Sequence, residues 1–545
     1  MGKIKIGQLE LNILWLAIFA AIAMKTWLVL SGVLSFNADE AVVALMARHI
    51  TQGELPIFFY GQAYMGSLDA LLVSFGFRIF GEQIWVLRFV QSLLYLGTVV
   101  TTFQLGKIAF GSREIGKIAA LLMAVPTVNV SLYTTVTLGG YGEALLLGNL
   151  LLICTLRIAN NIEDKKNVPW WRWLLWGGMA GVGWWIFGLS LVYSLPAGLY
   201  LLWKIVQLWK GGERLEVGKA LGGLLAGVMV GAAPWWVYAS IHGWGDMISE
   251  LSGGAIANIT AVPALLKPFG RLFNLLLLGS TVTFGLRPPW AVTWLMFPLL
   301  PFLLMFWVGV MVYSVRRIYP KQLNRAKVGL VGAVMLTLFL GFIFTPFGND
   351  PSGRYFVPLA VPMALFAADM IISYVDKSKI LSWGLLLMIL VFNLGGTIQM
   401  ACKYPPGITT QFDVIAQVDH DYMDDLIAFL EEQNINRGYT NYWVAYPLAF
   451  LSQEELIFIP RLPYHSDFRF TPRDDRYAPY DKMVAQADEV AYITTNHPAL
   501  NAALRENFTA HGITWEEKEI GDYHIFYALS EIIRPPELDL NAKGL

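Results

Sequence analysis

Two adjacent carboxylates, Asp39 and Glu40, stand just beyond the first long apolar run, within the segment Ser35-Phe36-Asn37-Ala38-Asp39-Glu40-Ala41. A carboxylate can act as a general base that takes a proton from a hydroxyl group. Successive residues of a helix point about 100° apart, so only one of the two can face a given reacting atom. We expect Asp39 to be this base. Glu40 has an equally good structural explanation, because Asn37 can cap the following helix and Glu40 can complete a capping box.

Two further segments carry polar groups ahead of apolar runs. Glu143 follows Leu138-Gly139-Gly140-Tyr141-Gly142, where it could bind a hydroxyl group or a divalent cation, or simply favour the first turn of a helix. Arg354 and Tyr355 belong to the segment 348–358. The guanidinium of Arg354 could stabilise a departing anion or contact lipid headgroups. Weaker rivals for the anion are Lys267, Arg271 and Arg287.

The elements that position these groups are membrane helices. The chain has 545 residues, of which 56% are hydrophobic and 14% charged, and its mean hydropathy is +0.52. A membrane span needs about 20 apolar residues. The sequence predicts about eleven, near 11–31, 85–106, 114–131, 141–158, 171–188, 189–208, 219–241, 291–315, 328–346, 355–375 and 380–401. The stretch 171–209 is apolar throughout and must turn near Phe187 to form two of them. Lys25 and Asp369 fall inside spans near their ends, where we expect them to snorkel.

Basic residues of short loops concentrate on the cytoplasmic side of a membrane. With the N-terminus inside, 20 of the 29 Lys and Arg residues before position 405 fall inside. This arrangement predicts a multi-pass plasma-membrane protein with a cytoplasmic N-terminus. Two long outer loops follow, 32–84 and 242–290. The first holds two helix-like pieces, Asp39–Thr51 and Met65–Phe80, which we expect to lie in the membrane interface.

The composition changes from Pro405 onward. Before that point 29 basic residues face 17 acidic ones, and after it 10 face 23. The predicted helices of the tail alternate with strand-like runs, which is typical of a small α/β domain. We therefore predict a transmembrane domain at 1–404 and a soluble extracytoplasmic α/β domain at 405–545. No clustered basic face indicates nucleic-acid binding, and the dispersed histidines form no zinc signature.

The first outer loop resembles that of a known family. The matching residues are Asp39-Glu40-Ala41, Ala47-Arg48-His49-Ile50, Gln52-Gly53, Leu55-Pro56, Tyr60-Gly61-Gln62, Tyr64-Met65-Gly66-Ser67-Leu68, Phe80-Gly81 and Leu87-Arg88. As a set they are similar to GT-C membrane glycosyltransferases, in the protein O-mannosyltransferase and aminoarabinose-transferase-like branch, family 39. The resemblance covers residues 11–110 well. Where many members have Lys-Pro-Pro, this chain has Tyr60-Gly61-Gln62-Ala63-Tyr64-Met65-Gly66, so the identity of the acceptor is left open.

The resemblance implies a GT-C-like fold and a hexosyl- or pentosyltransferase that uses a polyprenyl-phosphate sugar. It assigns catalysis to Asp39 and donor or acceptor binding to Glu40, Gln62, Tyr64, Glu143, Arg354 and Tyr355, with Arg354 on the donor phosphate. The acceptor is a lipid, a glycan or a protein at the outer face. A divalent cation could be held by Asp39, Glu40 and Glu143.

Two alternatives remain open at this point. The chain could be a lipid-sugar transporter or a scaffold without catalysis, although its spans offer few polar residues to line a path. It could also be a polymerase or ligase of lipid-linked glycans.

Overall fold

A computed structural model describes residues 4–6, 9–11, 13–251, 266–318, 325–350, 352–375, 377–538 and 540. The chain divides into two compact units. The membrane unit comprises Met1–Ser31, Tyr64–Asp69 and Arg88–Met400, and the α/β unit comprises Gly32–Ala63, Ala70–Leu87 and Ala401–Leu545. The segment 252–265 of the second predicted outer loop lies outside the described residues.

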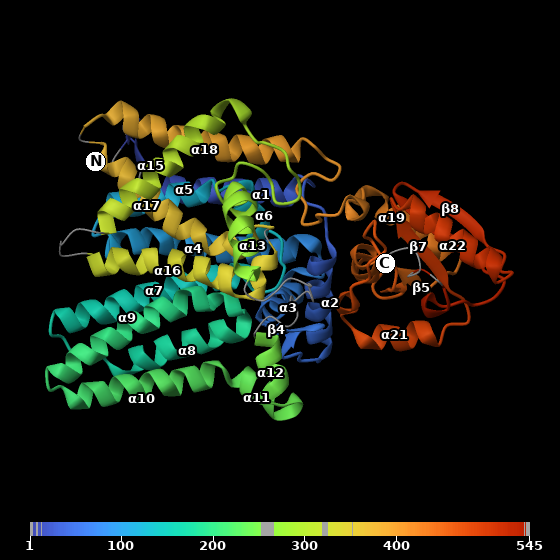
Figure 1. Cartoon of the computed structure of the whole chain (residues 1–545), viewed down its shortest axis with the longest axis horizontal. Helices are drawn as coiled ribbons and strands as arrows, with labels where there is room; N and C mark the ends of the chain where they lie inside the picture. Colours follow the sequence, from blue (N-terminus) through green and yellow to red (C-terminus); the bar gives the residue numbers. More distant parts are fainter. Residues whose placement is uncertain are drawn as a thin grey trace. The chain divides into compact units, whose positions relative to one another are not determined.

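The membrane unit is built from long apolar helices (Figure 1). They are α1 (Ile13–Leu30), α4 (Ile84–Ala109), α5 (Arg113–Ala124), α6 (Val128–Tyr133), α7 (Tyr141–Glu163), α8 (Trp170–Ile186), α9 (Leu191–Lys210), α10 (Arg214–Gly231), α11 (Ala233–His242), α12 (Trp244–Leu251), α13 (Lys267–Phe273), α14 (Ser280–Thr283), α15 (Leu300–Ile318), α16 (Arg325–Phe344), α17 (Ala360–Ser373) and α18 (Lys379–Ala401). A short hairpin, β1 (Ile4–Ile6) with β2 (Leu9–Leu11), precedes α1.

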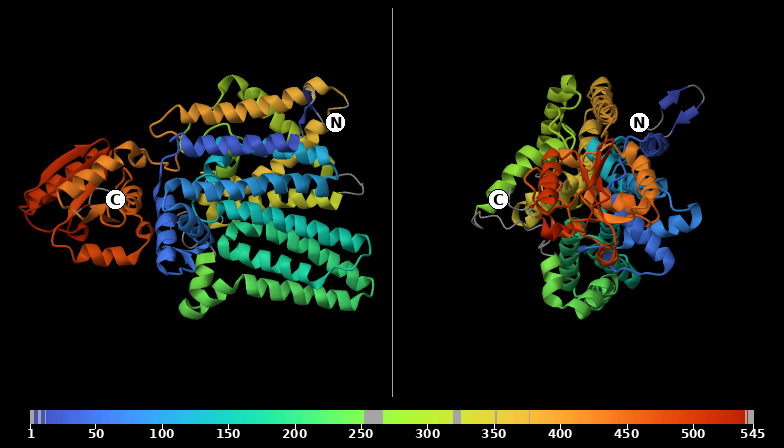
Figure 2. Two further views of the ribbon diagram at one scale, coloured as in Figure 1. Left: turned by 180° about the vertical axis from the view of Figure 1, so that it is seen from behind. Right: turned by 90° about the vertical axis from the view of Figure 1, so that its right-hand side faces the viewer.

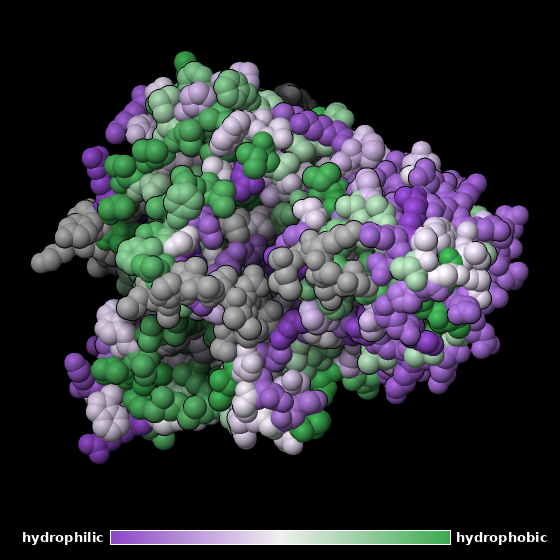
Figure 3. Space-filling model, turned by 45° about the vertical axis from the view of Figure 1, so that its right-hand side comes forward, coloured by the Kyte–Doolittle hydropathy of each residue, from purple (hydrophilic) through white to green (hydrophobic). Residues whose placement is uncertain are grey.

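Among the described residues, eight helices are long and apolar enough to cross a membrane, or nine if the bent pair α10 and α11 is one span. This is fewer than the predicted number of about eleven. The difference has local causes: α8 has only 17 residues, and the predicted span 114–131 is interrupted between α5 and α6 by Val125-Pro126-Thr127. Proline lacks the N–H that would continue a helix. The chain is nevertheless a multi-pass helical membrane protein, and the visible helical face of this unit is largely hydrophobic (Figure 3).

The expected turn within 171–209 is confirmed. α8 ends at Ile186, Phe187 is extended with φ −167° and ψ 129°, and a 3-10 turn at Gly188–Ser190 starts α9. α8 also packs closely on α10, as Figure 1 shows. Gly177 and Gly181 of α8 face Gly227 and Gly231 of α10 at backbone contact, so a side chain at these positions has no room. Small residues four apart are a common means of close helix packing in membranes.

Contrary to the expectation from the sequence, the side chain of Lys25 does not snorkel. It is 3% exposed, and its Nζ donates to the carbonyl and hydroxyl oxygens of Thr134 and to the hydroxyl of Thr135, each at 2.7 Å. The ammonium also lies 4.3 Å from the ring centre of Tyr95. A cation is favourable next to the carboxyl end of a helix, which here is α6. Asp369 instead forms an ion pair with Arg317 at 3.0 Å.

The α/β unit contains a five-stranded sheet in the order β6-β5-β7-β9-β8. Its strands are β5 (Arg437–Thr440), β6 (Ile457–Pro460), β7 (Ala491–Thr495), β8 (Glu516–Ile520) and β9 (Tyr523–Tyr527), and its helices are α19 (Met423–Glu432), α20 (Tyr442–Leu451), α21 (Ala478–Ala485) and α22 (Pro498–Ala510). β5 is parallel to β6 and β7, and β9 is antiparallel to both of its neighbours. The alternation predicted for the tail is thus observed (Figure 2).

The first outer loop provides α2 (Ala38–Gln52), β3 (Phe58–Phe59), β4 (Gln62–Gly66) and α3 (Leu68–Phe80). The two expected helices exist, but residues 65 and 66 belong to strand β4 rather than to α3. α2 packs on α20 inside the α/β unit, and nearly all of its residues are buried. The predicted domain boundary at 404/405 and the interfacial position of these helices stay predictions.

Candidate functional site

Asp39 lies in the first turn of α2, where the backbone is fixed by a cap. The Oδ1 atom of Asn37 accepts a hydrogen bond from the N–H of Glu40 at 3.0 Å, so Asn37 is the N-cap as predicted. Glu40 is fully buried, whereas Asp39 is partly exposed. Of the two carboxylates, Asp39 is therefore the more accessible one.

A tyrosine from the C-terminal part of the chain binds Asp39. The hydroxyl of Tyr442 donates to Asp39 Oδ1 at 2.5 Å. Tyr442 is the first residue of α20, whose N-cap is Asn441. Burial, followed by the charge of Asp39, raises the pKa of the Tyr442 hydroxyl well above its ordinary value. The hydroxyl hence stays protonated and remains a donor.

Three other residues of the α/β unit surround this pair. The guanidinium of Arg476 lies 5.2 Å from the ring centre of Tyr442. Burial raises the pKa of Asp474 to about 7, against the opposing effect of Arg476, and the charge of Asp39 adds to the rise. Tyr464 forms a hydrogen bond with Asp474 and also interacts electrostatically with Asp39. Asp39 thus lies in a setting of two tyrosines, a second carboxyl group and an arginine.

The far end of α2 is also held by the C-terminal residues. Arg48 donates to the carbonyl of Phe450 at 3.0 Å, and its guanidinium lies 4.6 Å from the Phe450 ring centre. His49 contacts Glu454 at 3.0 Å and the hydroxyl of Tyr60 at 2.9 Å. These contacts assign His49 a structural role, in agreement with its place on a packed helix.

In the membrane unit, Arg354 follows Gly353, which has a φ of 102° that favours glycine. The Nη2 atom of Arg354 pairs with Asp350 Oδ2 at 2.6 Å, and the guanidinium lies 5.0 Å from the ring centre of Tyr355. Tyr64 and Tyr141 lie within electrostatic range of it. Within the described part of the chain, the buried Nε atom of Arg354 has no hydrogen-bond partner, so this side chain has a donor left for an anion.

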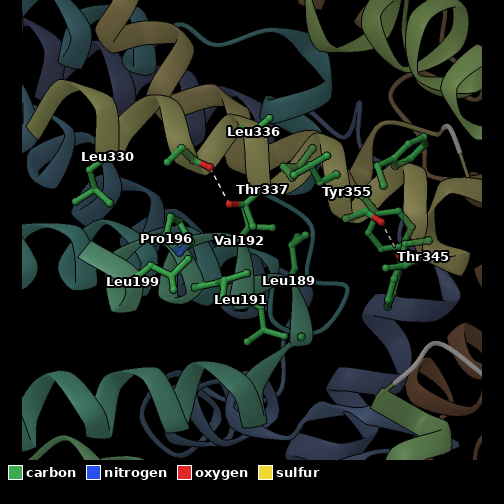
Figure 4. A pocket seen from close by; sticks show the side chains of 18 of the residues that line it. Leu189, Leu191, Val192, Pro196, Leu199, Leu330, Leu336, Thr337, Thr345 and Tyr355 are labelled. Atoms are coloured by element: carbon green, nitrogen blue, oxygen red, sulfur yellow. Dashed lines mark hydrogen bonds between the residues drawn. The ribbon is translucent and has the colours of Figure 1, made fainter. Parts of the chain in front are cut away.

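Tyr64 and Tyr355 also line an apolar pocket of about 1030 Å³ between α9 and α16. Figure 4 shows Leu199 and Leu330 at one end of the pocket and Tyr355 and Thr345 at the other. The hydroxyls of Thr337 and Thr345 donate to carbonyls of α16, so the wall presents mainly hydrocarbon. The pocket suits a long apolar chain with a polar group near Tyr355.

Glu143 is placed with Asp69, a residue that the sequence reasoning did not single out. Both are buried, at 4% and 2% exposure, and they hydrogen-bond each other. Gln91 Nε2 donates to Asp69 at 2.9 Å and to Glu143 at 3.3 Å, and the hydroxyl of Thr137 donates to Asp69. Burial raises the pKa of Asp69. These contacts favour a structural role for Glu143, while its binding of a sugar or a cation stays a prediction.

The remaining predicted residues take different places. Gln62 opens β4 and is partly exposed. The guanidinium of Arg287 donates hydrogen bonds to the hydroxyl of Thr281 and to the carbonyls of Leu278, Pro288 and Pro289. Arg271 donates to Asn349 at 3.0 Å. Among the described residues, no three His, Cys, Asp or Glu side chains gather in a group that could hold a metal ion.

Comparison with known proteins identifies the fold. The model of the dolichyl-phosphate-mannose-protein mannosyltransferase family matches residues 66–238. The crystal structure of ArnT from Cupriavidus metallidurans bound to undecaprenyl phosphate is similar over 95% of this chain and 99% of that one, with 12% identity and a TM-score of 0.58. The Archaeoglobus fulgidus oligosaccharyltransferase, in complex with zinc and sulfate, is similar over 88% of this chain and 68% of that one, with 13% identity and a TM-score of 0.52. The chain has the GT-C fold.

The shared fold and the family match confirm the resemblance of the chain to GT-C membrane glycosyltransferases, although the family match begins only at residue 66, near the end of the first outer loop. No curated protein sequence matches the chain. The family match includes Asp69 and Glu143 but neither Asp39 nor Arg354. Sequence reasoning missed Tyr442, Asp474, Arg476 and Asp69. For Tyr442 one signal was available, because Asn441, which follows β5, is a residue type that commonly caps helices.

Proposed function

We propose that the chain is a membrane glycosyltransferase that moves a sugar from a polyprenyl-phosphate-linked donor to an acceptor at the outer face of the membrane. The sugar is a hexose or a pentose, and the acceptor is a lipid, a glycan or a protein. The observation that carries this proposal is the apolar pocket of about 1030 Å³, which has Tyr64 and Tyr355 at its lining and Arg354 beside them.

This combination matches the chemistry of the donor. A polyprenyl phosphate has an apolar tail that gains free energy when it leaves water and an anionic head that arginine binds well. The Nε atom of Arg354, buried and without a partner among the described residues, supplies one donor to the phosphate. Tyr64 and Tyr355 supply hydroxyls beside it. ArnT, which has the same fold, was crystallised with undecaprenyl phosphate, and this supports the assignment.

Asp39 is the proposed base. Its carboxylate takes the proton of the acceptor hydroxyl while that oxygen forms a bond to the anomeric carbon of the sugar. The bond between this carbon and the phosphate oxygen breaks, and the polyprenyl phosphate leaves with the electron pair. Arg354 stabilises the charge that develops on the phosphate. Direct displacement of this kind inverts the anomeric configuration, and Glu40, Gln62 and Glu143 remain proposed binding residues.

The proposed orientation puts the N-terminus in the cytoplasm and the α/β unit outside the plasma membrane. It follows from the basic residues of the short loops, 20 of which fall inside in this arrangement. Asp39 then faces the compartment in which lipid-linked sugars are used.

The test is the transfer of a labelled sugar from a polyprenyl-phosphate donor in proteoliposomes with a panel of acceptors. We expect Asp39→Asn to lower kcat by about 10²- to 10⁴-fold, because the base is lost. We expect Arg354→Gln to raise the KM for the donor about 10- to 100-fold, because the phosphate loses a charged partner. Asp424→Asn and Arg316→Gln change exposed residues of the same types and serve as controls.

A wild-type rate for Asp39→Asn would refute the assignment of the base. Tight binding of the donor without turnover on any acceptor would favour a lipid-sugar transporter or a scaffold instead. Products that grow by repeated addition of lipid-linked glycans would indicate a polymerase or ligase.

A further inference from the structure

The carboxyl edge of the sheet in the α/β unit is a place where such folds usually bind ligands. β5 is parallel to both of its neighbours, and the connection through α20 leads from β5 to β6 on one side while β7 lies on the other. In open α/β sheets, ligands bind beyond the carboxyl ends of the strands at the point where the connections diverge. Here this point is marked by Asn441, which donates to the hydroxyl of Thr495 at 2.9 Å.

In this chain the residue that follows Asn441 contacts a side chain of the first outer loop. Tyr442, which follows Asn441, donates to Asp39 Oδ1 at 2.5 Å. The contact is part of a long interface between α2 and α20. The rings of Phe36 and Phe450 lie 5.7 Å apart, and Arg48 donates to the carbonyl of Phe450 at 3.0 Å. The register of α2 on α20 is therefore fixed on both sides of Asp39.

From this geometry we propose that Tyr442 is a positioning residue that orients Asp39 for proton transfer. The C-terminal α/β domain thus supplies the side chain that holds the catalytic base in place. This inference rests on the proposed function. Tyr442 holds Oδ1 through its hydroxyl, and the carboxylate cannot rotate without losing that bond. Oδ2 is then the oxygen that accepts the proton of the acceptor hydroxyl. A base must be held within hydrogen-bond reach and in the right direction, and a single charge-assisted bond achieves this.

The groups around Tyr442 keep its hydroxyl protonated, so that it remains a hydrogen-bond donor. The hydroxyl stays protonated because burial raises its pKa, and the nearby charge of Asp39 raises it further. Arg476 lies against the ring of Tyr442, and Asp474 and Tyr464 complete the set of charged or titratable groups near the pair. A phenylalanine would fill the same space and keep the packing, but it would leave Asp39 Oδ1 without its donor.

The experiment compares Tyr442→Phe with Tyr492→Phe in the full chain. Tyr492 is a matched control, because it is fully buried in the sheet of the same unit and its hydroxyl donates to the carbonyl of Ile533 at 2.7 Å. We expect Tyr442→Phe to lower kcat about 10- to 100-fold with the donor KM unchanged, whereas Tyr492→Phe keeps the wild-type kcat. An equal loss in both variants, or an unchanged kcat in Tyr442→Phe, would overturn the proposal.

A second measurement does not depend on turnover. Carboxyl groups react with a water-soluble carbodiimide, and peptide mass spectrometry reports the modification rate of Asp39. We expect this rate to rise about tenfold in Tyr442→Phe and to stay constant in Tyr492→Phe, because the hydrogen bond that protects the carboxylate is lost only in the former. If the wild-type chain transfers no sugar but this difference is found, the proposed function fails and the positioning of Asp39 stands. If the rates are equal, the role of Tyr442 is refuted whatever the activity.

Discussion

Two pairs of side chains differ in the exposure and in the hydrogen-bond partners of their carboxyl groups. Asp39 is partly exposed and accepts a hydrogen bond from the hydroxyl of Tyr442. Asp69 and Glu143 are both buried and hydrogen-bond each other, with Gln91 donating to both. The partner of Asp39 is thus a neutral donor, whereas the partner of Asp69 is a second acid.

This difference decides which carboxyl group can do chemistry. Two acids that face each other in a buried place cannot both be ionised, so they share a proton and hold neighbouring segments together. A carboxylate that accepts a hydrogen bond from a phenol can take a proton from a substrate. The chain therefore uses the same functional group for structure in the membrane unit and, in our proposal, for catalysis in the α/β unit.

The largest effect is expected from removing one member of the buried pair. Asp69→Ala leaves Gln91, Thr137 and Glu143 without their shared partner, which costs roughly 3 kcal/mol of stability. Thermal unfolding in detergent measures this loss, with Asp246→Ala at an exposed position as the control. A loss no larger than that of the control would show that the pair does not stabilise the fold.

A smaller effect is expected from the carboxyl group near Asp39. The pKa of Asp474 is about 7 in the folded chain against an ordinary value of 3.8, so between these values the folded state holds a proton that the unfolded state has released. Its stabilising contribution is full at low pH and is lost as the pH rises through 7. Between pH 6 and pH 8 this loss amounts to about 1.4 kcal/mol.

Asp474→Asn cannot ionise and should lose this part of the pH dependence. Thermal unfolding of the wild type and the variant at pH 6 and pH 8 measures it, and Asp424→Asn controls for an exposed carboxyl group. The same pH dependence in the wild type and in Asp474→Asn would show that Asp474 does not hold its proton near neutral pH.

The smallest effect is expected on activity at Glu143. If its role is structural, Glu143→Gln keeps the hydrogen bonds to Asp69 and Gln91, and the transfer rate should fall less than about threefold. Asp39→Asn, measured beside it, gives the large loss described above. A loss at Glu143 as large as that at Asp39 would instead support the proposed binding role of Glu143 and remove the contrast between the two pairs.

The sequence predicted those features that depend on neighbours along the chain. Asn37 ahead of Asp39 and Glu40 indicated the start of α2, and alternating patterns indicated the strands and helices of the tail. Local patterns failed where the partner is distant. Lys25 bonds residues more than 100 positions away, and Asp69 reads as an ordinary acid at the start of a helix until Glu143 is placed against it. Pro126 was the local signal for the break between α5 and α6.

The hydrogen bond between Asp39 and Tyr442 joins residues 403 positions apart, and among the described residues all candidate spans after α1 are encoded between them. During synthesis, Asp39 therefore leaves the ribosome well before Tyr442. A nascent chain can already carry the candidate spans found in the described residues and still lack the partner of Asp39. The proposed base would therefore gain its final orientation only after Tyr442 has been synthesised and α20 has packed on α2.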